Sequence, residues 1–162
     1  MMHLHTRNTI YSDSRKARTC CRVIFILLLV FIWQNSLQTA STSSQLSTGI
    51  LASLQELWLS LFGTAFPLSH HLLRKLGHFS EFMLLGIFGT LSATLGKNKK
   101  VSYMPPVLYI GLAAAVIDET LQHFSIGRSP EVVDILIDHA GFLTGVLCVC
   151  CCYKLTQLCI RG

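Results

Sequence analysis

Charged residues are scarce in this 162-residue sequence. Asp, Glu, Lys and Arg make up 13% of the chain, whereas they make up about 25% of an average soluble domain. Eight acidic and thirteen basic residues give a formal net charge of +5, and the mean hydropathy is +0.53. A soluble globule of this size needs a more highly charged surface. The composition therefore argues against a soluble enzyme, a disordered chain and a nucleic-acid-binding protein.

Several sequence signatures of catalysis are also missing. The chain has no Gly-x-Ser-x-Gly element for a serine nucleophile, no H-E-x-x-H zinc spacing and no Gly-rich phosphate loop before a helix. No internal repeat is visible and no segment has the alternating pattern of a strand. From these absences we expect no metal and no cofactor, and whether the protein is an enzyme stays open.

Four apolar stretches account for most of the chain. A helix that crosses a bilayer needs about 20 residues, and the stretches near residues 22–40, 76–96, 105–122 and 135–153 reach this length, the first and third only with some polar residues included. We therefore predict an all-α membrane protein with a four-helix bundle at 22–153, a basic segment at 1–21 and a short tail at 154–162. The first stretch also resembles a signal peptide, so its retention stays open.

The basic residues indicate the orientation of these spans. Ten of the thirteen fall on one side if all four stretches cross. These ten are Arg7, Arg15, Lys16, Arg18, Arg22, Lys97, Lys99, Lys100, Lys154 and Arg161. Because cytoplasmic segments are enriched in Lys and Arg, we predict that both termini are cytoplasmic and that the protein lies in the cytoplasmic membrane.

The segment between the first two spans is then external. Apolar residues from Ile50 to Phe62 recur at helical spacing around Trp58, and Glu56 is the only charge among them. This pattern predicts an amphipathic helix that lies in the outer membrane interface, although a helix packed on the bundle would have the same pattern. We expect Pro67 to end it.

Acidic residues converge near the external side. Counted at about 1.5 Å per residue from the cytoplasmic ends of their spans, Glu81, Asp118 and Asp138 all lie at a depth of about 20–22 Å. His78, Gln122, His123 and Asp134 are expected one turn further out, with Arg74, Lys75 and Arg128 just above them. Ionised groups inside a bilayer need partners or water. We therefore expect either a polar pocket that opens outward or a polar clamp between helices.

Helical spacing supports this convergence. Arg74, His78 and Glu81 share one helix face, and Asp118 and Gln122 share another. On the fourth span, Asp134 and Asp138 continue into Gly141 and Gly145, whose G-x-x-x-G spacing allows a second helix to approach closely. We favour packing within the chain over dimerisation.

Two segments resemble the VanZ-like family of membrane proteins. R-K-L-G-H-F-S-E-F at 74–82 is similar to the family's R-K-x-x-H-x-x-E-Y element. The order D-E-T-L-Q at 118–122, Gly127-Arg128, and then Asp134, Asp138, Gly141 and Gly145 resembles D-E-x-x-Q … P-G-R … D-x-x-x-[ND]-x-x-G-x-x-x-G. A Ser/Gln-rich run at 34–47 looks like the weaker first element. Phe82 replaces the usual Tyr, and Ile126 stands where Pro precedes Gly-Arg.

The resemblance implies a multi-pass bacterial membrane protein connected with the cell envelope and with resistance to the lipoglycopeptide teicoplanin. We expect the polar site to bind membrane lipids and a lipoglycopeptide or a wall-precursor lipid. Arg74, Lys75 and Arg128 would hold an anionic group, and the ligand would be oriented by His78, Glu81, Asp118, Glu119, Gln122, Asp134 and Asp138. An enzyme that modifies such a lipid would use His78, Glu81, Asp118 or Glu119 as acid and base. A proton-linked transporter and a purely structural clamp are the remaining hypotheses.

Overall fold

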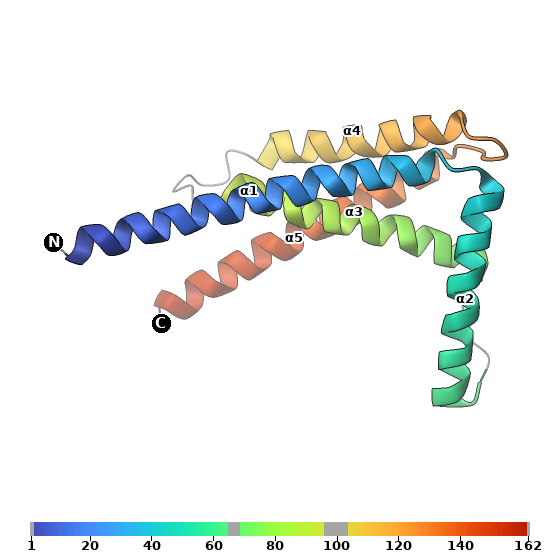
Figure 1. The fold of residues 1–162 in the computed structure, drawn as a ribbon, viewed down its shortest axis with the longest axis horizontal. Coiled ribbons are helices and arrows are strands. Elements are labelled where there is room, and N and C mark those ends of the chain that lie inside the picture. The colour runs from blue at the N-terminus through green and yellow to red at the C-terminus, as the bar shows by residue number, and fades with distance from the viewer. Residues whose placement is uncertain (1, 65–68, 96–103, 162) are drawn as a thin grey trace.

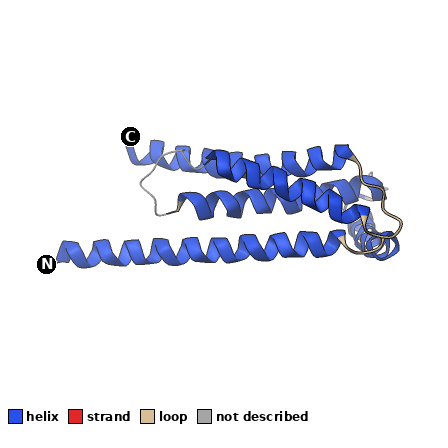
Figure 2. Ribbon diagram, turned by 90° about the horizontal axis from the view of Figure 1, so that it is seen from above, coloured by secondary structure: helices blue, strands red, loops and turns tan. Residues whose placement is uncertain are grey.

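The computed structural model describes residues 2–64, 69–95 and 104–161 of the chain. These form five helices: α1 (Met2–Ser36), α2 (Ala40–Phe62), α3 (His70–Thr94), α4 (Met104–His123) and α5 (Val132–Arg161). No strand occurs among these residues (Figure 2). The prediction of an all-α protein is therefore confirmed.

Four of the helices form an elongated bundle and α2 lies across one end of it (Figure 1). α1 and α4 run toward α2, whereas α3 and α5 start near α2 and run away from it. Both termini consequently lie at the opposite end. We call the two ends of the bundle the α2 end and the terminal end.

Three helices are long and apolar enough to cross a membrane, within the described part of the chain. They are Ser14–Ser36 in α1, His70–Thr94 in α3 and Val132–Cys159 in α5. α4 has the position of the third predicted span, but it is not among the three, so a fourth span stays a prediction. Large apolar side chains cover the outside of the bundle, as Leu27, Ile110 and Leu136 show. Such a surface suits lipid and does not suit water.

The helix ends differ in part from the prediction. The first span was expected to continue to residue 40, but α1 ends at Ser36. The reason is that the side chain of Thr39 caps a new helix by accepting a hydrogen bond from the Thr42 backbone N–H at 3.4 Å. α2 therefore includes the Ser/Thr-rich segment before residue 50. It ends before Gly63, whose φ of 66° is a left-handed C-cap, and Pro67 lies outside the described residues.

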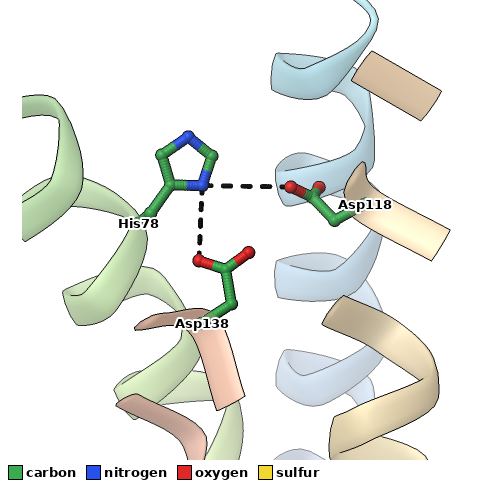
Figure 3. A group of neighbouring side chains, drawn as sticks. All are labelled: His78, Asp118 and Asp138. Atoms are coloured by element: carbon green, nitrogen blue, oxygen red, sulfur yellow. Dashed lines mark ion pairs between the residues drawn. The ribbon is translucent and has the colours of Figure 1, made fainter. Parts of the chain in front are cut away.

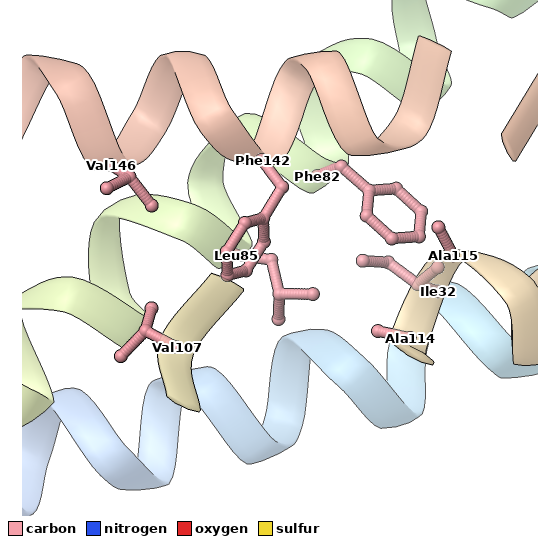
Figure 4. Packing of buried hydrophobic residues seen from close by; sticks show 8 residues of the cluster. All are labelled: Ile32, Phe82, Leu85, Val107, Ala114, Ala115, Phe142 and Val146. Carbon is pink, nitrogen blue, oxygen red and sulfur yellow. The ribbon is translucent and has the colours of Figure 1, made fainter. Parts of the chain in front are cut away.

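The hydrophobic core joins all four bundle helices (Figure 4). Ile32 of α1 and Leu85 of α3 lie near Phe142 of α5, which is fully buried. The remaining members are Phe82, Val107, Ala114, Ala115 and Val146.

α3 and α5 make the closest contact in the bundle. A Cβ added at Gly141 would lie 2.3 Å from the carbonyl oxygen of Phe79, and one at Gly145 would lie 2.1 Å from that of Met83. Gly86 of α3 has the same relation to the Phe142 carbonyl oxygen, at 2.2 Å. The two backbones thus touch directly, as small residues permit in membrane helix pairs.

Candidate functional site

Three chemically reactive side chains from three different helices meet near the α2 end (Figure 3). His78 of α3 lies between Asp118 of α4 and Asp138 of α5. Its Nδ1 atom is 3.9 Å from Asp118 Oδ2 and 3.5 Å from Asp138 Oδ1. Both carboxylates have no exposed surface. We call His78, Asp118 and Asp138 the acid–histidine cluster.

His78 therefore lies at the level of the two carboxylates, whereas the sequence placed it one turn further out. The sequence count started at the expected cytoplasmic end of each span. α5 continues to Arg161, past the expected end at residue 153, so the levels on α3 and α5 were not counted from a common plane. One helical turn is only about 5.4 Å, so an error of a few residues accounts for the difference.

Each oxygen of the Asp118 carboxylate accepts a hydrogen bond. Ser36 Oγ of α1 donates to Asp118 Oδ1 at 2.6 Å, and Gln122 Nε2 donates to Oδ2 at 3.1 Å. Ser125 Oγ in turn donates to the backbone oxygen of Ser36 at 2.7 Å. These contacts fix the position of the Asp118 carboxylate between α1 and α4.

Asp138 differs from Asp118 in this respect. Neither of its two buried oxygens has a hydrogen-bond partner among the described residues, and the same is true of His78 Nδ1. Their approach of 3.5 Å is an ion-pair distance without hydrogen-bond geometry. Buried polar atoms are normally satisfied, so these atoms need an explanation.

Glu81 belongs to a second network beside the cluster. Asn35 Nδ2 of α1 donates to Glu81 Oε1 at 3.5 Å, and Gln38 Nε2 donates to Asn35 Oδ1 at 3.4 Å. The backbone oxygen of Asn35 accepts a hydrogen bond from Arg128 Nη2 at 3.2 Å. Glu81 and the loop after α4 are thus connected through α1.

The remaining predicted acids bind other groups at the α2 end. Lys75 Nζ lies 3.1 Å from Asp134 Oδ1 and 3.9 Å from Glu131 Oε2. Glu119 Oε1 accepts a hydrogen bond from the Glu131 backbone N–H at 2.5 Å. Glu119 therefore points away from its neighbour Asp118. Its hydrogen bond fixes the loop between α4 and α5.

Two arginines, Arg74 and Arg128, belong to the α2 end of the bundle. Burial lowers the pKa of Arg128 from its ordinary value, and the positive charge of Arg74 lowers it further, while Asp118 and Glu119 oppose this effect. Neither arginine forms an ion pair with a carboxylate in the part of the chain that the structure describes. The Nε atom of Arg128 is buried without a hydrogen-bond partner there. These two cations are therefore not neutralised by direct ion pairs.

The structure thus divides the predicted site residues into groups. His78, Asp118, Gln122 and Asp138 meet, Glu81 lies in the neighbouring network, and Lys75 with Asp134 forms a separate pair. His123 is exposed and packs edge-on against Phe124. Sequence reasoning missed Asn35 and Ser36 as partners of Glu81 and Asp118. The available signal was that both are polar residues at the end of the first apolar stretch, level with the converging acids.

Two cavities are found away from the acid–histidine cluster. One of about 660 Å³ is an open groove along α2, lined by residues such as Thr42, Gly49 and Leu57. The other, of about 240 Å³, lies toward the terminal end beside Arg22 and Phe25. Within the cluster, Asp118 and Asp138 have no exposed surface, whereas the His78 side chain is 21% exposed.

Comparison with known proteins identifies one family. The family model described as VanZ/LLP1 matches residues 22–153. This range runs from the middle of α1 to the later part of α5. It includes every residue of the site. No curated protein and no solved structure matches the chain.

Proposed function

Because the chain belongs to the VanZ/LLP1 family, we propose that it acts at the outer face of the cytoplasmic membrane. There it recognises an anionic group of an envelope lipid or of a lipid-bearing glycopeptide antibiotic such as teicoplanin. The apolar helices and the family membership establish a membrane protein. The proposal adds the face, the ligand class and the residues that bind it.

The distribution of positive charge supports this orientation. Arg15, Lys16 and Arg18 occur in the half of α1 nearer the terminal end, Arg22 lies near the middle of α1, and Lys154 occurs near the end of α5. By the positive-inside rule the terminal end faces the cytoplasm. The α2 end, with the acid–histidine cluster, then faces outward.

The shape of α2 suits a position at the outer membrane surface. It runs across the bundle axis (Figure 1), and Ile50, Leu57 and Phe62 expose more than half of their surface. Trp58 packs on Phe62 with ring centroids 4.3 Å apart, and its Nε1 donates to Thr64 Oγ1 at 3.3 Å. An apolar helix with a tryptophan anchor is typical of the membrane interface.

The observation that carries the function is the pair of arginines without ion-pair partners. Arg128 Nη2 donates to the Asn35 backbone oxygen beside the site, while its buried Nε has no hydrogen-bond partner among the described residues, and the charge of Arg74 acts on it. A phosphate or carboxylate bound between them would relieve this repulsion and form charge-assisted hydrogen bonds. Lys75 supplies a third positive charge beside them, although it is already paired with Asp134.

Substitutions of the two arginines test this proposal. Arg74→Gln and Arg128→Gln remove one cation each, and Arg22→Gln removes a cation near the middle of α1 as a matched control. We expect teicoplanin or anionic-lipid binding by the purified protein to weaken about 10- to 100-fold in the first two variants, because a hydrogen bond to a charged group contributes about 1.5–3 kcal/mol. Teicoplanin resistance of cells that express each variant should follow binding. Unchanged binding and resistance in both the Arg74 and the Arg128 variant, with normal membrane insertion, would reject the proposal.

A membrane enzyme is the second candidate. The placement of His78 between two buried carboxylates favours it, because an imidazole next to Asp118 and Asp138 is suited to move a proton. The substrate would be the same envelope lipid or wall precursor. Mass spectra of lipids from cells with and without the protein distinguish the two functions. A modified species that disappears in His78→Gln supports catalysis, and identical spectra with and without the protein count against it.

A further inference from the structure

The acid–histidine cluster has the composition of a metal-binding site. One ligand atom from each of His78, Asp118 and Asp138 lies within 4.8 Å of the other two. The three residues come from α3, α4 and α5, so the fold and not a local motif brings them together (Figure 3). Among the described residues, this is the group of His, Cys, Asp and Glu side chains whose ligand atoms converge in this way.

The distances fit a small divalent cation. Metal–ligand bonds of about 2.0–2.2 Å at a tetrahedral angle place the ligand atoms about 3.3–3.6 Å apart. Nδ1 of His78 is 3.5 Å from Oδ1 of Asp138 and 3.9 Å from Oδ2 of Asp118. The ligand oxygens of Asp118 and Asp138 lie within 4.8 Å of each other, so the two carboxylates must approach by up to about 1.2–1.5 Å to reach the tetrahedral separation.

The three residues differ in their hydrogen bonds. Asp118 accepts hydrogen bonds that orient it, whereas Asp138 and His78 Nδ1 lack hydrogen-bond partners among the described residues. Ser36 and Gln122 donate to Asp118, as partners that orient a metal-binding carboxylate do. Asp138 has no exposed surface, and both of its oxygens are without hydrogen-bond partners in the described part of the chain. Nδ1 of His78 lies at ion-pair distance from it and likewise has no hydrogen-bond partner there. A buried carboxylate in this state is costly unless a cation binds it.

The charges of the cluster also favour a bound divalent cation. Asp118 and Asp138 carry two negative charges when ionised, and a protonated His78 would balance only one of them. The nearest described lysine, Lys75, is paired with Asp134 and Glu131, so it does not neutralise the cluster. A divalent cation balances two carboxylates and leaves His78 neutral, which is the form that binds metals.

We propose that His78, Asp118 and Asp138 bind one divalent cation of the Zn²⁺ or Mn²⁺ type. One imidazole nitrogen and two carboxylates suit these ions, because imidazole favours zinc and carboxylate favours manganese. Three protein ligands leave a coordination position for an outside oxygen. Sequence analysis predicts no metal because it looks for ligands at short spacing, whereas these are 40 and 20 residues apart. The inference goes beyond the proposed function and does not depend on it.

Manganese binding to the purified, untagged protein tests the site without any lipid or antibiotic. After treatment with a chelator, Mn²⁺ is titrated into the protein in detergent, and the free ion is followed by its electron paramagnetic resonance signal. Mn²⁺ prefers oxygen and nitrogen ligands to thiolates, so the seven cysteines do not compete. We expect about one bound ion per chain, and a loss of affinity of at least about 100-fold in Asp138→Asn and in His78→Gln, since loss of an outer-shell partner alone costs 10- to 100-fold.

Glu131→Gln is the matched control. It removes a half-exposed carboxylate from the same end of the bundle, 3.9 Å from Lys75, and should bind Mn²⁺ like the unchanged protein. Asp138→Asn keeps the size of the side chain, and His78→Gln gives a second measurement if the first variant does not fold. Absence of saturable Mn²⁺ and Zn²⁺ binding in the unchanged protein would overturn the proposal. Equal affinity in folded Asp138→Asn or His78→Gln would overturn it as well.

Discussion

Replacing Gly141 by alanine tests whether the close contact between α3 and α5 is needed for both stability and the site. The new Cβ would lie 2.3 Å from the carbonyl oxygen of Phe79. To reach a tolerable separation of about 3.2 Å, α5 must move away from α3 by about 0.9 Å. Gly141 follows Asp138 by three residues, which is less than one turn, so the movement also carries Asp138 away from His78.

The free energy of unfolding should fall by about 2 kcal/mol. Overpacking of a well-packed core costs up to about 3 kcal/mol, and a gap of about 1 Å forfeits up to about half of the dispersion energy of the atoms facing it. Alanine recovers about 1 kcal/mol because it has a higher helix propensity than glycine. The His78–Asp138 separation of 3.5 Å would lengthen beyond 4 Å if α5 moved directly away from α3, by about the same displacement.

Thermal unfolding in detergent, followed by tryptophan fluorescence, provides the assay. Trp33 is a suitable reporter because it lies in the bundle, where its Nε1 donates to the Ala114 backbone oxygen at 3.4 Å, and Trp58→Phe removes the second signal. Gly77→Ala is the matched control, since a Cβ at this position of α3 meets nothing within 4 Å. It should stabilise the protein by about 0.5–1 kcal/mol.

Equal stability of Gly141→Ala and Gly77→Ala would refute the reasoning. Such a result would mean that α3 and α5 adjust at no cost, and that their backbone contact does not determine the position of Asp138. Loss of stability with unchanged Mn²⁺ affinity would refute only the second step, the coupling of the contact to the cluster.

Three further changes have defined outcomes. Ser36→Ala removes the 2.6 Å hydrogen bond to buried Asp118 and should lower the free energy of unfolding by about 1–2 kcal/mol; a neutral result would mean that water or Gln122 replaces it. Lys75→Met and Asp134→Asn should show a coupling of about 1 kcal/mol in a double-mutant cycle of thermal unfolding, because their 3.1 Å ion pair is mostly buried; additive effects would contradict this. Phe142→Ala empties a fully buried position and should cost about 3 kcal/mol by the same assay, whereas Tyr109→Ala on the exposed surface should cost far less.

The sequence was sufficient for the helical class, for three of the spans and for much of the site. Apolar length and the 3.6-residue period are local properties, so α3 and α5 could be located from the order of residues alone. The convergence of Asp118 and Asp138 followed from counting helical rise along their spans. The Arg74–His78–Glu81 face likewise depends only on helix geometry.

Contacts between helices were harder to predict. Asp118 and Glu119 were assigned to one site, but adjacent helical residues point about 100° apart, and Glu119 instead accepts a hydrogen bond from Glu131. The donors Asn35 and Ser36 both come from α1. Ser36 precedes its partner Asp118 by 82 residues. Which side of α1 faces the acids depends on the rotation of that helix, and an apolar run without periodicity does not specify it.

Two kinds of contact hold the helices of the bundle together. His78 and Asp138 belong to a pair of helices that is locked by glycines, whereas Ser36 and Asp118 belong to α1 and α4, which pack through side chains. α2 is joined to both pairs of helices, since the Ala40 backbone N–H donates to the Ile126 backbone oxygen at 3.1 Å and Nε2 of His70 in α3 lies 3.3 Å from the Ser44 backbone oxygen. It therefore ties the loop after α4 to the start of α3, across the end of the bundle that holds the cluster.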